Sequence, residues 1–228
     1  MISQRRKNNF KYLNLNVAPI WAAAFIFMAS TNFCYASNSN AIEIPPQIEQ
    51  TTQDYDLKGF RGTFFDMSEQ EVIQSIEDDF GYTTDLLKEE IHPLSKTKII
   101  SLVYANLIPN TGPAQISYVF GYESKKLIQI NISWNESKFL TEKEILKISA
   151  LLQNHLMGLG FAQDKIETAI PLNPSDLILF RGEDVDKNLA ILVIHGLDSK
   201  KKTAPNTPME LTLSFQKDSL NPDIYKEE

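Results

Sequence analysis

The first regular pattern of apolar and polar residues after the N-terminal region has the period of a helix. Ser68 has the side chain of a helix N-cap, and Glu71, three residues later, completes a capping box. The apolar residues that follow recur every three or four positions, as on one helix face. They are Val72, Ile73, Ile76 and Phe80. The pattern therefore predicts a helix that opens at residues 67–71 and stops at Gly81.

A longer helix is predicted for residues 141–157. Thr141 and Glu144 form a second capping box, and glycines follow the last apolar position. The inward residues are Ile145, Ile148, Leu152 and Leu156. Two shorter helices are expected at residues 84–91 and 163–170.

Six segments have the composition or the alternation of β-strands. They lie near residues 98–107, 114–122, 127–134, 176–181, 189–196 and 209–215. In the third segment, apolar and polar residues alternate, which is the period of a strand with one buried face. Its inward residues would be Ile128, Ile130, Ile132 and Trp134. A turn centred on Lys125 would place Tyr118 opposite Ile132, so we expect the aromatic residues of 114–122 on the same face.

The order of these elements repeats along the chain. Residues 80–82, Phe-Gly-Tyr, lie 79 residues before residues 159–161, Leu-Gly-Phe, and residues 129–134 match 210–215. Such self-similarity over about 80 residues predicts an internal duplication. We therefore expect an α+β fold of two tandem ααβββ modules with antiparallel sheets. The modules would span residues 58–138 and 139–218, followed by a C-terminal tail at 219–228.

This order of elements resembles two families of bacterial envelope proteins. Two tandem modules of this length resemble the β-lactamase-inhibitor-protein fold. A single unit that opens with Met67, Ser68, Glu71 and Val72 resembles the small outer-membrane-assembly lipoproteins of the SmpA/OmlA type. The resemblance implies a non-catalytic binding, inhibitory or assembly role. It carries over no individual functional residue.

The strand predicted at 189–196 is apolar at successive positions, from Leu189 to Ile194. If Ile191 and Val193 face one side of the sheet, then Leu192 and Ile194 face the other. In the aligned first module those two positions are Ser117 and Val119, so we expect Leu192 and Ile194 to form an apolar strip on the outer face. The neighbouring module, the N-terminal lead segment or an external partner would cover this strip.

The N-terminus has the pattern of a cleaved secretory signal peptide. Its first residues carry four basic side chains and no acidic one, and an apolar stretch of roughly a dozen residues follows, which is shorter than a membrane span. We place cleavage between Ala36 and Ser37, with Cys34 as the weaker alternative of a lipid-attachment site. Residues 1–36 would be the signal peptide and 37–57 a flexible lead segment.

Removal of this leader changes the charge and the cysteine content. The whole chain has 22 Lys and Arg, 29 Asp and Glu and one Cys, and the leader contains four of the basic residues and the cysteine. The exported chain would therefore have a formal charge of −11 and no disulfide. Because a basic surface is absent from such a chain, we expect no nucleic-acid partner. A bacterial periplasmic or secreted location is expected.

Candidate catalytic groups are few. His92 precedes a proline, whereas His155 and His195 occupy positions inferred to be apolar, so we expect both to be core histidines. No pair of histidines has the spacing of metal ligands, and we expect no metal and no cofactor.

Charged clusters have simpler interpretations. Asp78-Asp79 and Glu89-Glu90 are predicted to lie on solvated helix faces, since adjacent helical residues diverge. Residues 200–202, three lysines, fit a solubilising loop better than a contact with anionic lipid. Arg181 ends an apolar strand, where it either reaches solvent or binds a partner carboxylate.

The sequence thus favours an exported, non-enzymatic envelope protein whose partner is another envelope protein or a peptide. The candidate contact residues are Leu192, Ile194 and Arg181. A periplasmic hydrolytic or ligand-processing enzyme and an envelope structural component are the alternatives. Membrane association is not predicted.

Overall fold

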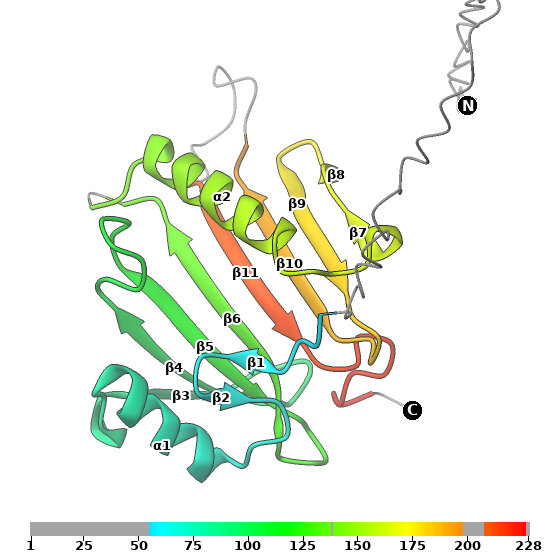
Figure 1. Cartoon of the computed structure of the whole chain (residues 1–228). Helices are drawn as coiled ribbons and strands as arrows, with labels where there is room; N and C mark the ends of the chain where they lie inside the picture. Colours follow the sequence, from blue (N-terminus) through cyan, green and yellow to red (C-terminus); the bar gives the residue numbers. More distant parts are fainter. Residues whose placement is uncertain (1–54, 138, 198–207, 227–228) are drawn as a thin grey trace, which may run out of the picture. The chain divides into compact units, whose positions relative to one another are not determined.

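The computed structural model describes residues 55–137, 139–197 and 208–226, all of which belong to one compact unit within residues 49–228. The predicted leader, its cleavage site at Ala36 and Ser37, most of the lead segment and the three lysines at 200–202 lie outside the described residues. The described residues contain two α-helices, α1 at Glu69–Phe80 and α2 at Glu142–Met157 (Figure 1). No helix of the described ranges has the length and apolar character that crossing a membrane requires.

The described strands form one large antiparallel sheet and a small hairpin. The hairpin pairs β1 (Gly59–Phe60) with β2 (Thr63–Phe64). The strands of the large sheet are β3 (Lys88–Ile91), β4 (Lys98–Tyr104), β5 (Ala114–Phe120), β6 (Leu127–Asn135), β7 (Ile166–Glu167), β8 (Ile170–Asn173), β9 (Asp176–Glu183), β10 (Leu189–His195) and β11 (Glu210–Gln216). Their spatial order is β3-β4-β5-β6-β11-β10-β9-β7, with β8 also paired to β9.

The α+β class is confirmed, but the strands of the two predicted modules form a single sheet. The junction is the pairing of β6 with β11, in which Ile132 lies opposite Leu213 and Trp134 opposite Leu211. These paired side chains are buried. The hydrophobic core is therefore continuous across the junction, and the described strands do not divide into one sheet for each predicted module.

Both long helices form where the sequence predicts them. At the start of α1 the Ser68 backbone N–H donates to the Glu71 carboxylate at 2.6 Å, and at its end Gly81 adopts a left-handed conformation with φ 71°. At the start of α2 the Thr141 N–H donates to the Glu144 carboxylate at 2.7 Å. Both capping boxes satisfy backbone donors that the helix itself leaves unpaired.

The prediction of two shorter helices is wrong. Residues 84–91 contain a 3₁₀ turn at Thr84–Leu86 followed by β3, and residues 163–170 contain a 3₁₀ turn at Gln163–Lys165 followed by β7 and the start of β8. An eight-residue segment has little helix stability of its own, because helix nucleation is unfavourable. Pairing with a neighbouring strand satisfies the backbone instead, as between Glu90 and Ile99.

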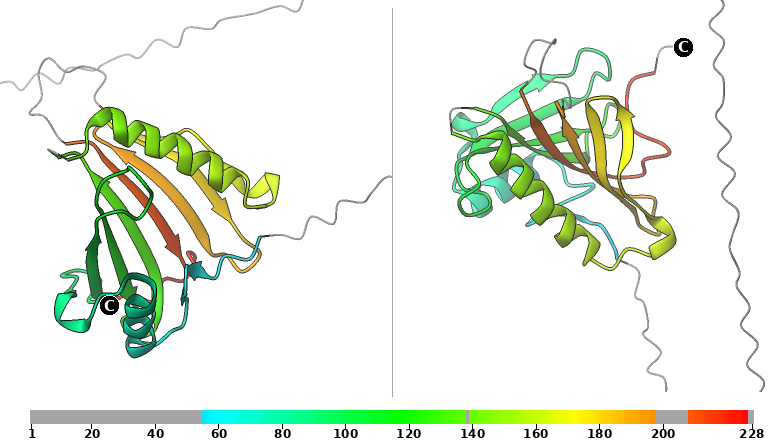
Figure 2. Two further views of the ribbon diagram at one scale, coloured as in Figure 1. Left: turned by 60° about the vertical axis from the view of Figure 1, so that its left-hand side comes forward. Right: turned by 90° about the horizontal axis from the view of Figure 1, so that it is seen from above.

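The core lies on one face of the sheet, under α1, α2 and the β1–β2 hairpin (Figures 1 and 2). Its largest fully buried side chains are Trp134, Tyr118, Phe120 and Phe180. α2 contributes the four residues predicted to point inward, and α1 contributes Val72, Ile76 and Phe80. The buried face predicted for the first hairpin is therefore confirmed for Tyr118, Phe120 and Trp134, whereas Tyr122 is only half-buried and packs against Tyr225.

The register of that hairpin differs from the prediction by two residues. Tyr118 lies opposite Ile130 rather than Ile132, because the connection runs from Gly121 to Lys126 and a bulge follows Val119. A shift of two residues keeps Ile130, Ile132 and Trp134 on their predicted face, but the predicted inward position of Ile128 is wrong. The bulge affects Ile128, which is only half-buried on the opposite face, while Leu127 takes the core position.

The face predicted for Leu192 and Ile194 is wrong. Both side chains are fully buried in the core beneath α2, whereas Ile191 and Val193 lie on the opposite face and are half-buried. The prediction aligned Leu192 with Ser117. A one-residue error in such an alignment moves a side chain to the other face of a strand, because side chains alternate.

Candidate functional site

The candidate site is the face of the large sheet opposite the two helices, here called the open face. No described helix covers it, as Figure 2 shows. Polar side chains at its centre come from three adjacent strands, β5, β6 and β11, and are half-buried. They are Ser117, Asn131, Ser133, Thr212 and Ser214.

Hydrogen bonds fix the middle of this polar strip. The Asn131 Oδ1 accepts from the Ser214 Oγ at 2.8 Å and from the Gln129 Nε2 at 2.7 Å. Asn131 and Ser214 lie opposite each other across the β6–β11 junction. The strip is thus ordered at the point where the two halves of the sheet meet.

Aliphatic side chains border the polar strip on both sides. On the β10 side, Ile191 and Val193 are half-buried, and Val193 lies opposite Ile178 of β9. On the β4 side, Ile99 and Val119 face the same surface. The open face therefore has a polar centre between apolar borders.

A hollow of about 410 Å³ lies on the β4–β6 side of the open face. Its apolar lining consists of Ile99, Val119, Ile128, Pro222 and Ile224. Polar groups from His92, Gln129, Asn131 and Lys217 also line it. A concave site with an apolar lining and a few polar groups is the usual form of a small binding site. The Lys217 Nζ pairs with Asp66 at 2.6 Å, and the His92 Nδ1 lies 2.9 Å from the Ser95 Oγ, so both polar groups are held in place.

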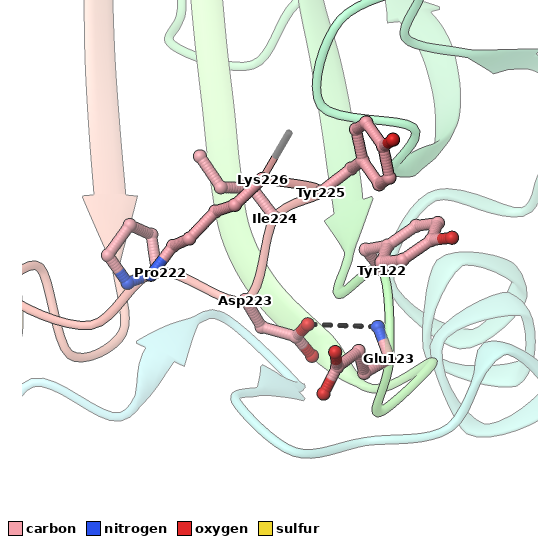
Figure 3. Close-up of a pocket in the computed structure, with 7 residues that line it drawn as sticks. All are labelled: Tyr122, Glu123, Pro222, Asp223, Ile224, Tyr225 and Lys226. Carbon is pink, nitrogen blue, oxygen red and sulfur yellow. Dashed lines mark hydrogen bonds between the residues drawn. The ribbon is translucent and has the colours of Figure 1, made fainter. Parts of the chain in front are cut away.

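The C-terminal tail forms one wall of this hollow, a position that the sequence pattern does not predict. The Asp223 carboxylate accepts a hydrogen bond from the backbone N–H of Glu123 at 2.9 Å (Figure 3). It accepts another from the backbone N–H of Ser124, also at 2.9 Å. Burial raises the pKa of Asp223, but the hydrogen bonds from Ser124 and Glu123 outweigh this effect, and the net pKa is lowered. The sequence features that could have indicated this contact are the proline and aspartate in the tail and Gly121 in the turn.

Arg181 lies on β9 opposite Ile191 and is engaged within the chain. Its guanidinium pairs with Glu167 at 2.8 Å and with Glu183 at 3.3 Å. The pKa of Glu183 is lowered, mainly by its hydrogen bond to Lys187. Of the three candidate contact residues, Arg181 is therefore half-exposed and paired, whereas Leu192 and Ile194 are buried.

The prediction that two histidines are core residues is wrong. His155 is exposed on α2, and the His195 side chain is 38% exposed, with its Nδ1 3.3 Å from the Asp176 Oδ1. A hydrogen bond from Asn173 is the main reason why the pKa of Asp176 is lowered, and His195 contributes. Among the described residues, no three potential metal ligands gather into a site.

The acidic pairs have separate roles. Asp79 on α1 accepts from the Gly62 backbone N–H at 3.0 Å. Glu89 and Glu90 lie on the strand β3 rather than on a helix, and they pair with Lys98 at 2.8 Å and Lys88 at 2.7 Å respectively. Neither pair converges on one point.

Comparison of the chain with protein-family models, with curated proteins and with solved structures finds no match.

Proposed function

We propose that this chain is exported into the bacterial envelope and acts there without catalysis, by binding another envelope protein or a peptide through the open face. The observation that carries the proposal is the unequal covering of the sheet. Both helices pack on one face, and the other presents an ordered polar strip between aliphatic borders.

The edges of the sheet favour the open face as the contact surface. At one edge β3 is fully exposed and carries three charged residues, Lys88, Glu89 and Glu90. At the other edge β8 contains Pro171, which has no backbone N–H to donate. Charges and proline on edge strands oppose the addition of a further strand. A partner is therefore expected to meet side chains of the face rather than the backbone of an edge.

The internal duplication is part of this proposal. Each half of the chain has a long helix, a 3₁₀ turn and then strands that end at the centre of the sheet. Ile132 and Leu213, which the repeat treats as equivalent, lie directly opposite each other in antiparallel strands. A two-fold relation between the halves would produce this arrangement. It supports the resemblance to the tandem inhibitor and assembly modules.

Export rests on the basic and apolar pattern of residues 1–36. Protein isolated from envelope material should therefore begin at Ser37. Intact-mass measurement checks this expectation, and a mass that still includes residues 1–36 would contradict it.

The binding role is tested by affinity capture from an envelope extract with the exported chain as bait. The variant Ser133→Arg places a bulky charge on the polar strip, and Asn154→Arg places the same charge on the exposed side of α2. We expect the unsubstituted chain and Asn154→Arg to capture the same partner in similar amounts. The amount captured by Ser133→Arg should be at least tenfold lower. Equal retention by both variants, or no specific partner for the unsubstituted chain, would reject the proposal.

A further inference from the structure

The C-terminal residues Pro222–Lys226, here called the strap, run along the β5–β6 turn, with a tight turn at Asp223 where the Ile224 N–H donates to the Pro222 carbonyl at 2.9 Å (Figure 3). The strap is joined to the rest of the chain by backbone hydrogen bonds at two points. The Tyr122 N–H donates to the Asp223 carbonyl, and the Tyr225 N–H donates to the Ser95 carbonyl, each at 2.9 Å. The strap therefore bridges the β5–β6 turn and the β3–β4 connection.

The β5–β6 turn is shaped to receive a carboxylate. Two successive N–H groups, of Glu123 and Ser124, donate to Asp223. Gly121 allows the close approach, since a Cβ at that position would lie 2.1 Å from the Asp223 Oδ2. A carboxylate held by paired backbone N–H groups is a recurring form of acidic-peptide recognition.

The two residues after Asp223 fill complementary apolar places. Ile224 lines the hollow of the open face together with Val119. The Tyr225 ring lies edge-on to the Tyr122 ring, with 5.4 Å between their centroids and an interplanar angle of 72°. Each position of the strap thus meets a separate feature of the turn or the hollow.

The strap is attached lightly despite these contacts. Ile224 and Tyr225 remain 37% and 39% exposed, and Leu220, just before the strap, is 67% exposed. Segments that bury little apolar surface open at a free energy well below that of global unfolding. The strap can therefore leave its place while the sheet stays folded.

We propose that the surface under the strap, formed by Gly121–Ser124, Ser95 and the hollow, is a peptide-recognition site that the chain's own C-terminus occupies in the free protein. The site takes a segment that turns tightly at an acidic residue and continues with an aliphatic and an aromatic residue. A partner protein that carries such a segment displaces the strap. The hollow belongs to the open face, but the recognition proposed here rests on the contacts of the strap and not on the binding role proposed for the polar strip.

The test measures binding of a fluorescent peptide with the sequence of residues 219–228 to the whole exported chain by anisotropy. The unsubstituted chain should bind weakly because its own strap competes. The variant Asp223→Ala loosens the strap and should bind at least tenfold more tightly. A peptide with alanine in place of the aspartate should bind this variant with at least tenfold lower affinity. Equal binding by both chains, or equal binding of both peptides, would overturn the proposal.

A matched double variant separates the site from the strap. Gly121→Ala combined with Asp223→Ala keeps the loosened strap but places a Cβ where the peptide carboxylate must lie, so binding should be lost. Retained binding would overturn the proposal. Circular dichroism and thermal unfolding verify that the variants fold.

Hydrogen exchange on the unsubstituted chain gives an independent answer if a variant fails to fold. The amides of Glu123 and Ser124 should exchange through local opening, faster than those of Ile132 and Leu213. Exchange of all four only on global unfolding would overturn the proposal. Concentration-dependent dimers seen by ultracentrifugation would show that the site binds the tail of a second copy. That result would also overturn the proposal that a separate partner protein displaces the strap.

Discussion

Asn131 in the middle of β6 and Trp134 near its end lie three residues apart and face opposite sides of the sheet. Trp134 is 1% exposed in the core, whereas Asn131 is half-buried in the polar strip. The alternation of β6 is sufficient to predict both positions. At the residue scale, one strand thus separates what stabilises the fold from what is available for contact.

Trp134→Ala should lower the free energy of unfolding by about 3 to 5 kcal/mol, because it leaves a cavity in the core. Asn131→Ala should cost only about 1 kcal/mol, since it removes hydrogen bonds on a half-buried surface. Urea denaturation measures both values. Near-equal costs would contradict the assignment of the two faces.

Leu192→Asp should destabilise the chain by at least about 4 kcal/mol, because it places an unpaired charge in the core. Ile191→Asp is the matched control on the open face, where Arg181 lies opposite, and should cost about 1 kcal/mol. Thermal unfolding compares them. A folded Leu192→Asp variant of nearly normal stability would place Leu192 on the surface after all.

Asp223 makes the attachment of the strap dependent on pH. Its pKa is lowered in the folded state, so its contribution is present above the ordinary aspartate pKa of about 3.9 and is lost as pH falls through the lower folded pKa. The amide resonances of Glu123 and Ser124 should report this release between pH 5 and 2, and Asp223→Asn should abolish it. A midpoint above the ordinary aspartate value would contradict the account.

At the element scale, signals that are local in the sequence predict structure well. Ser68 with Glu71, and Thr141 with Glu144, mark the starts of both helices because a capping box is complete within four residues. The segments after the helices are predicted less well. Their residues turn into strands because a neighbouring strand supplies the hydrogen-bond partners, and that neighbour is distant in the sequence.

The β9–β10 turn is a second element whose role depends on distant chain segments. The buried Asp184 carboxylate accepts from the Leu57 N–H at 3.0 Å and from the Asn188 N–H at 2.8 Å. The Asn188 amide donates to the Leu57 carbonyl at 3.2 Å. The turn thus holds the backbone of Leu57 by both its donor and its acceptor.

Asp184→Ala should therefore lower the free energy of unfolding by about 3 kcal/mol, because buried backbone donors lose a charged acceptor. Asp186→Ala, in the same turn but with an exposed side chain, is the control and should be nearly neutral. Chemical denaturation measures both. Equal effects would show that the Asp184 contacts do not stabilise the fold.

At the scale of the whole molecule, one pairing decides the architecture. The sequence predicts six of the strands and both long helices, but it does not reveal that β6 pairs with β11 and joins β3 to β11 into one sheet. The same limit applies to the candidate site. The polar side of β6 is visible in the sequence, whereas the assignment of Leu192 and Ile194 fails because the face of β10 depends on its alignment with partner strands.

The central claim is that the chain binds its partner through the open face. Covalent surface labelling of the exported chain, alone and with the captured partner, tests it most directly. We predict protection of Ser133, Thr212 and Val193 and unchanged labelling of Leu151 and His155 on the exposed side of α2. Protection confined to α2, with the open face labelled equally in both samples, would contradict the account.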